Sequence, residues 1–445
     1  MKFKTEITEG VIWKQLLAFS IPILISNLIQ QFYVTVDAVI VGKFVGDEAL
    51  AAVGSVGSLT GMIIGLFLGI SAGASVVIAQ YYGAKNVEKM QNAVHTAMAF
   101  SIIGSLVMTV FGVAASPFLL RLMNSPPNVI GMSTTYLQIY FIGMLPALLY
   151  NMGAGILRAV GDSRRPLYYL VISAIINILL DLLFVVVFKL GVVGAAVATP
   201  LAQCAAAILV LINLTTTHDI HRVIPRKIKF HAEMIKRIVI IGIPTGLQSV
   251  VIAFSNVIIQ TKINSFGDIA MAAWVALMRI DGFIYVIMAA SGIAMTSFIG
   301  QNYGAKRYDR IKQSVKVSLA MTCGVTFGLA AIMVIFARQS FLLFTDNEAV
   351  IEIGIIMLYW IVPLYGLFSV IEILSGTIRG TGNSIMPMAI SLIGMCGLRL
   401  VWVLGIMLIW NTIIMLCLCY PVTWVVTSGV LIFYYFKVIK RLEKT

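Results

Sequence analysis

Four acidic side chains interrupt long apolar stretches of this 445-residue chain: Asp37, Asp181, Asp281 and Glu372. An ionised carboxylate among apolar residues is costly, so such a group pairs with a cation or takes up a proton. Asn177 precedes Asp181 by four residues, which places both side chains on one face of a helix. Carboxylate and amide oxygens grouped in this way can exchange protons or hold a hard cation such as Na⁺.

The apolar stretches that carry these acids are long enough to cross a membrane. The chain is 60% hydrophobic and 11% charged, with a mean hydropathy of +1.00, whereas a soluble domain carries about 25% charged residues. A spanning helix needs about 20 apolar residues. Twelve segments are long enough: 14–38, 53–80, 93–117, 134–157, 167–188, 194–217, 238–260, 271–299, 317–337, 353–377, 387–409 and 412–436. The sequence therefore predicts an all-α integral membrane protein with twelve transmembrane helices.

Basic residues are distributed unequally between the two ends of these spans. With a cytoplasmic N-terminus, 24 of the 31 lysines and arginines fall on the cytoplasmic side and 5 on the opposite side. The positive-inside rule describes this asymmetry. We therefore expect a multi-pass protein of the inner (plasma) membrane with both termini in the cytoplasm. The net charge of +13 would face anionic lipid headgroups, so no nucleic-acid partner is expected.

Sequence motifs recur at a separation of 221 residues. VIAQYYGAKN at 77–86 returns as FIGQNYGAKR at 298–307, and GILRAVGDSRRP at 155–166 returns as GTIRGTGNSIMP at 376–387. Self-similarity over this length indicates two structural repeats. The acids are not repeated, because residue 402, the counterpart of Asp181, is a tryptophan.

Each repeat is expected to hold six spans. Because six is an even number, both repeats enter the membrane from the same side and are related by a pseudo-twofold axis along the membrane normal. The predicted parts are an N-terminal six-helix lobe at 1–217, a cytoplasmic linker at 218–236 and a C-terminal six-helix lobe at 237–445. A cleft between two such lobes is where a substrate would bind.

Three motifs together resemble the multidrug and toxic compound extrusion (MATE) family, and its bacterial DinF-like branch most closely. They are the repeated junction QYYGAK/QNYGAK, the stretch VDAVIVGK at 36–43 and RAVGDSRRP at 158–166. The resemblance covers essentially the whole chain. It implies a coupling-ion site made from a first-span aspartate, a fifth-span Asn/Asp pair and a sixth-span hydroxyl. These positions correspond to Asp37, Asn177, Asp181 and Thr199, with Asn151 in the fourth span as a further contact.

The second half carries its own polar residues, for which two roles stay open. Arg399 in the eleventh span could form a structural ion pair with Asp281 or Glu372. Alternatively, Asp281, Glu372 and Arg399 could contact the substrate. Some branches of the family carry a coupling acid in the seventh span, but the sequence has none between Ile238 and Gln260.

Glycines recur along the second predicted span at 54, 57, 61, 65, 69 and 73. Such a stripe of small residues lets helices approach each other closely. Packing is the simpler interpretation. The alternative is a smooth face along which the helix slides during transport.

These features favour a secondary antiporter that exports lipophilic cationic compounds in exchange for H⁺ or Na⁺ by rocker-switch alternating access. We expect no cofactor beyond the coupling ion, no metal other than Na⁺ at Asp37, Asn177 and Asp181, and a monomer with a small organic substrate. The sequence has no GxxxxGK[ST] loop for ATP and no HExxH motif, so an enzyme is not expected. The alternative is a flippase for lipid-linked saccharides, a function of the related superfamily.

Overall fold

The computed structural model describes residues 7–122 and 129–443, and every regular element within these ranges is helical. The first half contains α1 (Ile12–Phe44), α2 (Asp47–Gly83), α3 (Val87–Leu122), α4 (Ile130–Ile142), α5 (Met144–Ala159), α6 (Arg164–Asp181), η1 (Leu182–Val187) and α7 (Gly191–Thr216). After η2 (Pro225–Lys227), the second half contains α8 (Ala232–Asn264), α9 (Asp268–Gly304), α10 (Tyr308–Ile335), α11 (Ala337–Leu342), α12 (Glu348–Ile361), η3 (Val362–Leu364), α13 (Tyr365–Gly380), α14 (Ile385–Ser391), η4 (Leu392–Gly397), α15 (Leu398–Val401), η5 (Trp402–Ile406), α16 (Met407–Ile409) and α17 (Ile413–Leu442).

The described helices reproduce the predicted spans. Eleven are long and apolar enough to cross a membrane, and the pair α4–α5, bent by 47°, supplies a twelfth. The prediction of an all-α membrane protein is confirmed.

The same irregularities occur in both halves. The fourth span breaks at Gly143 between α4 and α5, and its counterpart breaks at η3, which contains Pro363. Proline has no backbone N–H to donate to the preceding turn, so it interrupts the helix there. The fifth span of each half contains π-helical turns, and η1 begins directly after Asp181. Such turns are frequent at functional sites.

Contacts divide the chain into two compact units. The first unit contains Ile21–Ile243, and the second contains Glu6–Ser20 and Pro244–Thr445. The units and the predicted lobes divide the chain differently in two places. The first turns of α1 group with the second unit, and the linker with the first turns of α8 groups with the first unit. The divisions within α1 and α8 lie next to Pro22 and at Pro244, the proline inside each helix.

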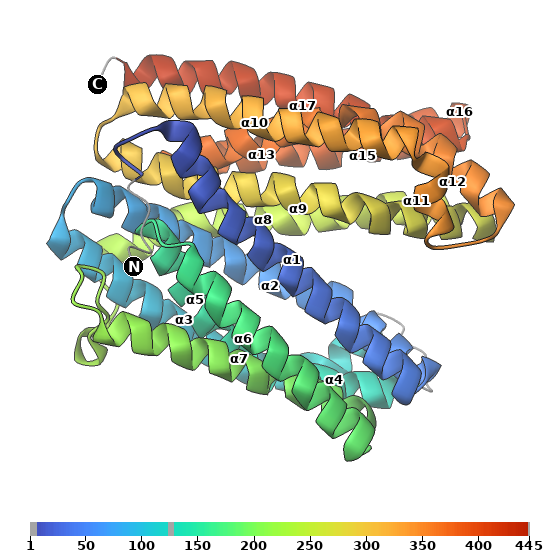
Figure 1. Cartoon of the computed structure of the whole chain (residues 1–445), viewed down its shortest axis with the longest axis horizontal. Helices are drawn as coiled ribbons and strands as arrows, with labels where there is room; N and C mark the ends of the chain where they lie inside the picture. The colour runs from blue at the N-terminus through green and yellow to red at the C-terminus, as the bar shows by residue number, and fades with distance from the viewer. Residues whose placement is uncertain (1–6, 123–128, 444–445) are drawn as a thin grey trace. The chain divides into compact units, whose positions relative to one another are not determined.

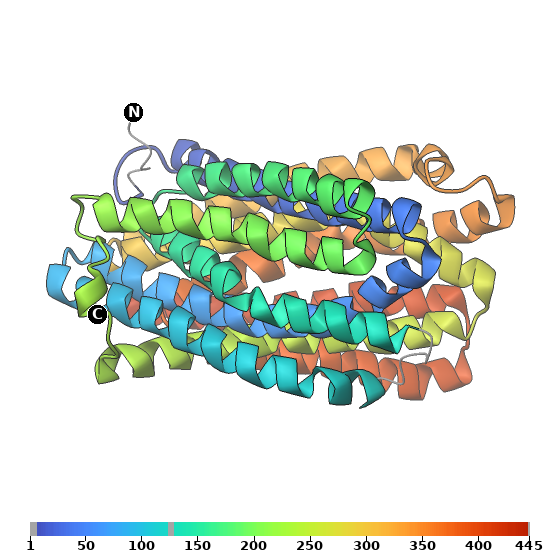
Figure 2. The same cartoon turned by 90° about the horizontal axis from the view of Figure 1, so that it is seen from below.

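In the first unit, α5 and α6 both pack against α7, and α5 also contacts α2 and α3. Figure 1 shows α5, α6 and α7 side by side in teal and green, and Figure 2 shows the same neighbours from below. Buried side chains from α2, α3, α5 and α7 form the core of this unit, among them Val77, Met90, Val94, Leu157 and Val210. α6 and α7 pack directly against each other along this unit.

In the second unit, α13 lies at the centre. It packs against α9, α10 and α17, and Figure 1 shows α10, α13 and α17 running alongside one another. Gly376 on α13 permits this packing, because a Cβ atom there would lie 2.4 Å from the carbonyl oxygen of Gly292 on α9.

The glycine stripe on α2 has different surroundings along its length. At Gly73, a Cβ atom would lie 2.6 Å from the backbone nitrogen of Gly242 on α8. At Gly54, Gly57 and Gly61 it would meet no atom within 4 Å. The packing interpretation is thus confirmed at Gly73, where two glycines let α2 and the first part of α8 touch.

Candidate functional site

Three helices of the first unit position the residues predicted for ion coupling. Asp37 lies on α1, Asn177 and Asp181 lie one turn apart on α6, and Thr199 precedes Pro200 on α7. Asp181 is 0% exposed, Asn177 2% and Asp37 9%. All three residues lie in spans predicted from the sequence, and the tertiary fold buries them.

The fold brings these side chains together. The Asn177 amide Nδ2 donates to Thr199 Oγ1 at 3.4 Å, and the carboxyl groups of Asp37 and Asp181 are close enough to repel each other electrostatically. Four buried oxygens lack a hydrogen-bond partner among the described residues: Asp37 Oδ1, Asn177 Oδ1 and both carboxylate oxygens of Asp181.

Buried apolar side chains follow the site residues along α1 and lie on α2, η1 and α7. They form one buried cluster, which contains Ile40, Val41, Ala49, Val185, Val192 and Ala195. Two unpaired carboxylates in such an environment are costly to ionise together, so the arrangement is suited to sharing a proton or holding a cation. Among the described residues no group of three His, Cys, Asp or Glu side chains could hold a metal ion. Two carboxylates with neutral oxygens nearby are suited to H⁺ or to a monovalent cation.

Three polar residues at this site were missed in the sequence analysis. Tyr136 on α4 lies within electrostatic range of Asp37 and of Asp181, and Tyr33 on α1 lies beside Gln203 on α7. The sequence could have indicated Tyr33 and Gln203, because Tyr33 is four residues before Asp37 and Gln203 is four residues after Thr199. Residues four apart share a helix face. Tyr136 gave no such signal, because its position depends on how α4 packs.

Asn151 is engaged elsewhere. Its amide Nδ2 donates to the carbonyl of Ala147 on the same helix at 2.9 Å, and its own carbonyl accepts from Ser71 Oγ on α2 at 3.1 Å. The bond to Ser71 uses only the Asn151 backbone and would join α5 to α2 with any side chain there, so the contact predicted for the Asn151 side chain stays a prediction.

In the second unit, the hypothesis of an ion pair made by Arg399 is wrong for the described residues. Its Nη1 donates to Ser255 Oγ and to Asn256 Oδ1, both at 3.2 Å, and its guanidinium lies 4.2 Å from the ring centroid of Tyr420. Asp281 instead accepts a hydrogen bond from the Tyr365 hydroxyl at 2.5 Å. The reason is geometric: Arg399 faces α8 and α17, whereas Asp281 faces α13.

Glu372 also has surroundings of its own. Its side chain occupies a slot left by Gly292, where a Cβ atom would lie 2.8 Å from Glu372 Oε2. Arg379, seven residues later on α13, interacts with it electrostatically and donates to Gln248 Oε1 at 3.1 Å. Asp281 and Glu372 thus have different immediate partners, although both lie within electrostatic range of Tyr285 on α9.

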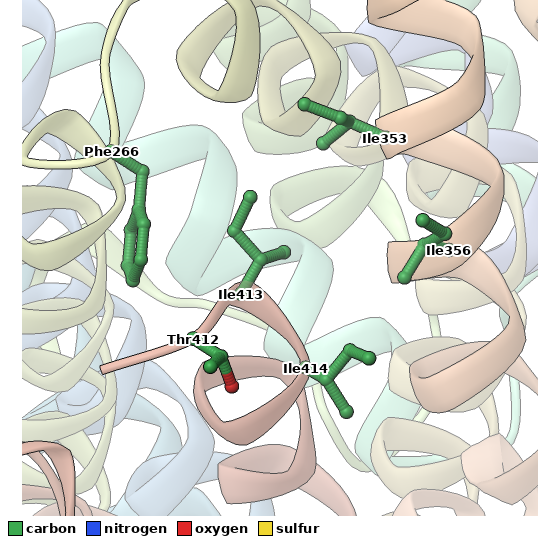
Figure 3. A pocket seen from close by; sticks show the side chains of 6 residues that line it. All are labelled: Phe266, Ile353, Ile356, Thr412, Ile413 and Ile414. Carbon is green, nitrogen blue, oxygen red and sulfur yellow. The ribbon is translucent and has the colours of Figure 1, made fainter. Parts of the chain in front are cut away.

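The second unit also contains an apolar pocket of about 320 Å³. Figure 3 shows the side chains that line it, which are Phe266, Ile353, Ile356, Thr412, Ile413 and Ile414. With one hydroxyl and no charged group, this pocket is unsuited to binding an ion, and none of the predicted site residues lines it.

Known proteins resemble this chain over most of its length. The MatE family profile matches residues 22–183 and 244–405, once in each half. "Probable multidrug resistance protein YoeA" of Bacillus subtilis (strain 168) is 30% identical over 395 residues, which cover 87% of this chain and 85% of YoeA. "Multidrug export protein MepA" of Staphylococcus aureus (strain N315) is 24% identical over 380 residues, covering 84% and 83%.

Solved structures share the fold. One described as an outward-facing conformation of a multidrug resistance MATE family transporter has a TM-score of 0.91 and 24% identity, and the match covers 100% of this chain and 99% of that one. A MATE structure in a bent conformation has a TM-score of 0.92 and 23% identity, with coverage of 100% and 99%. The DinF-like branch stays a prediction. The chain therefore belongs to the MatE family, the multidrug and toxic compound extrusion proteins, and is a multi-pass membrane transporter rather than an enzyme.

Proposed function

We propose that this protein is a secondary active antiporter that exports organic, lipophilic cationic compounds in exchange for H⁺ or Na⁺. The observation that carries the proposal is the set of four buried, unpartnered oxygens of Asp37, Asn177 and Asp181. The names of the relatives YoeA and MepA, which refer to multidrug resistance and export, support the export of small organic compounds.

The coupling ion would neutralise the charge of the two carboxylates. With the site empty, two carboxylates repel each other in a poorly solvated environment, which is costly. A proton shared between them, or Na⁺ held by them with Asn177 and Thr199, removes that repulsion. Binding of the ion therefore stabilises the conformation in which α1, α6 and α7 close around it, and ion release favours the other conformation. This difference between states is what drives rocker-switch alternating access.

The distribution of basic residues bears on the membrane and on the orientation of the chain in it. The distribution of 24 basic residues on one side and 5 on the other supports an inner (plasma) membrane protein with both termini cytoplasmic. A monomer within the lipid bilayer suffices, because the proposed coupling residues all belong to one chain.

The test uses purified protein in proteoliposomes that contain a fluorescent lipophilic cation. A pH gradient and a Na⁺ gradient are imposed separately on the wild type and on the variants Asp37→Asn and Asp181→Asn. We expect one gradient to drive movement of the cation and either variant to abolish it, with normal membrane insertion. Asp309→Asn is the matched control, because this side chain is 72% exposed.

Two results would overturn the proposal. Transport at the wild-type rate by either variant would mean that the carboxylates do not couple the ion. Movement under neither gradient would favour a flippase for lipid-linked saccharides or a different substrate class.

A further inference from the structure

The linker that joins the two halves is bonded to the start of α3, within the first unit. The side-chain amide of Gln91 donates to the carbonyl of Ile220 at 2.6 Å. One helical turn later, Nε2 of His95 lies 3.0 Å from the backbone nitrogen of Ile224. Both bonds reach the same stretch of the linker, so α3 fixes the path of the chain between α7 and η2.

The partners of His95 determine which of its ring nitrogens carries a hydrogen. Nδ1 lies 2.7 Å from the carbonyl oxygen of Gln91, and a carbonyl can only accept, so Nδ1 is the donor. The backbone N–H of Ile224 can only donate, so Nε2 must be unprotonated to accept from it. The bond to the linker therefore requires the neutral imidazole in one tautomer.

Protonation of His95 would turn this attraction into a repulsion. A hydrogen on Nε2 would point at the N–H of Ile224, and rotating the ring would not help, because a charged imidazole donates from both nitrogens. His95 is 2% exposed, so two donors would face each other in a buried place without an acceptor, which is costly.

The charges around His95 offer nothing to offset that cost. Lys227 on η2 and His231 in the linker are the charged or titratable side chains of the linker within electrostatic range of the ring. No carboxylate among the described residues lies within this range. An imidazolium at this position would thus have a cation beside it and no anion.

The helices that pack against α3 add no free acid near this ring. On α8, Glu233 is bonded to Lys89 of α3 at 3.0 Å and to the hydroxyl of Tyr81 of α2 at 3.3 Å. Arg158 on α5 interacts with a tyrosine of its own helix, and α4 packs against the later turns of α3.

The neighbouring contact between α3 and the linker does not share this sensitivity. The Thr96 hydroxyl accepts from the backbone N–H of His231 at 3.2 Å and lies 3.2 Å from its Nδ1. A hydroxyl can both donate and accept, and the carbonyl of Lys229 at 3.5 Å is a second acceptor for it. Thr96 can therefore keep contact with His231 in either protonation state.

The second half attaches the corresponding segment through a group that does not titrate. At the repeat separation of 221 residues, the counterpart of His95 is Lys316. The segment before α1, which is the repeat counterpart of the linker, is bonded by the guanidinium of Arg310 to the carbonyls of Ile7 and Gly10. Arginine stays charged in proteins, so this attachment does not depend on a proton.

We propose that His95 is a proton-sensitive latch for the linker. The neutral ring holds the linker on α3 through Ile224, and the protonated ring releases this stretch. The linker and the first turns of α8 both group with the first unit, so release loosens the segment that leads into the second half. The latch responds to pH on the side of the membrane where the linker lies, and it depends neither on the coupling ion nor on the substrate.

The experiment measures hydrogen–deuterium exchange of single backbone amides in the full-length protein in lipid nanodiscs. Exchange is compared at about pH 8 and about pH 5, on either side of the ordinary pKa of histidine, with labelling times adjusted to equal intrinsic exchange. We expect the protection of the Ile224 amide to fall about tenfold at the lower pH. The adjacent amide of Val223 donates to the carbonyl of Leu214 at 2.8 Å and should change less than about twofold.

Three variants assign the response to one ring. His95→Gln provides an oxygen that can accept from Ile224 and does not titrate, so protection should be equal at both pH values. His95→Phe keeps a ring without an acceptor, so protection should be low at both. His231→Gln removes the neighbouring histidine and should keep the wild-type response.

Three results would overturn the inference. Equal protection of Ile224 at both pH values in the wild type would mean that the bond does not respond to protons. A wild-type response in His95→Gln would place the sensor at another group. An equal fall at Val223 and Ile224 would indicate general loosening of the linker. If His95→Phe does not fold, the comparison of the wild type with His95→Gln still decides.

Discussion

The side-chain amide of Asn177 on α6 donates a hydrogen bond to the hydroxyl of Thr199 on α7 at 3.4 Å, one turn from the unpartnered carboxylate of Asp181. This bond joins the two helices at the proposed coupling site. It also leaves the Asn177 oxygen and the carboxylate oxygens available for an ion.

Replacing the Thr199 hydroxyl should weaken ion coupling without abolishing it. Thr199→Ala removes a neutral oxygen and the partner of Asn177, so we expect an apparent affinity for the driving ion lower by about three- to tenfold, equivalent to about 1 kcal/mol for one hydrogen bond. Thr199→Ser keeps the hydroxyl and should stay near the wild type. Initial export rates at increasing ion gradients measure this. As a control, Thr216→Ala at the exposed end of α7 should have no effect.

The carboxylate pair should make transport depend on pH, with a sign that identifies the coupling ion. Protons and Na⁺ compete for the same oxygens of Asp37 and Asp181. Acidifying the outside from about pH 8 to about pH 6 should therefore slow Na⁺-driven export, and should speed export if protons are the driving ion. Export rates from proteoliposomes at fixed membrane potential measure this response. Because Asp37→Asn is expected not to transport, the control is the exposed Asp309→Asn, which should keep the wild-type pH response. Export that did not respond to pH in the wild type would mean that the carboxylate pair does not titrate in the transport cycle.

The contact between α2 and α8 should tolerate no side chain at Gly73. Because a Cβ atom would lie 2.6 Å from the Gly242 backbone nitrogen, Gly73→Ala should lower the free energy of unfolding by about 1–3 kcal/mol. Thermal unfolding of the purified protein in detergent measures this. Gly61→Ala on the same helix is the control, since a Cβ there meets nothing within 4 Å. Equal stability of the two variants would contradict the packing interpretation.

The contact between α13 and α9 makes a parallel prediction in the second unit. Gly376→Ala would place a Cβ atom 2.4 Å from the carbonyl oxygen of Gly292, and a backbone atom cannot rotate away as a side chain can. We expect the free energy of unfolding to fall by about 1–3 kcal/mol. Gly282→Ala on α9 meets nothing within 4 Å and should resemble the wild type in thermal unfolding.

Arg310 on α10 should anchor the segment before α1. Its guanidinium donates to the carbonyls of Gly10 at 2.9 Å and Ile7 at 3.1 Å, and to Gln15 Oε1 at 2.7 Å, and the residue is 7% exposed. Arg310→Ala removes the donor that these three acceptors share, and the Ile7 carbonyl lies in a buried residue, so we expect the free energy of unfolding to fall by about 2–3 kcal/mol.

Limited proteolysis near the N-terminus, together with thermal unfolding, measures the effect of Arg310→Ala. We expect faster cleavage than in Arg307→Ala, which removes an exposed side chain of the same type from the same end of α10. If the two variants were cleaved at the same rate, the hydrogen bonds of Arg310 would not be holding this segment.

Local features of the sequence determined the spans, the repeat and the residues of the first site. A spanning helix is recognised by about 20 consecutive apolar residues. The twelve spans could therefore be located from neighbouring residues alone, without knowing which other helices they contact. The spacing of Asn177 and Asp181 placed both on one helix face for the same reason. The family resemblance then linked them with Asp37 and Thr199, which spacing alone cannot do.

Only the tertiary structure decided which side chains meet. Arg399 faces Ser255, Asn256 and Tyr420 rather than an acid, and Tyr136 comes within range of Asp37 because of how α4 packs. The first turns of α1 group with the second unit rather than with the rest of their own lobe. Partner choice depends on the rotation of each helix about its axis and on contacts between residues far apart in the chain. Local periodicity fixes which residues share a face, but it does not fix what that face touches.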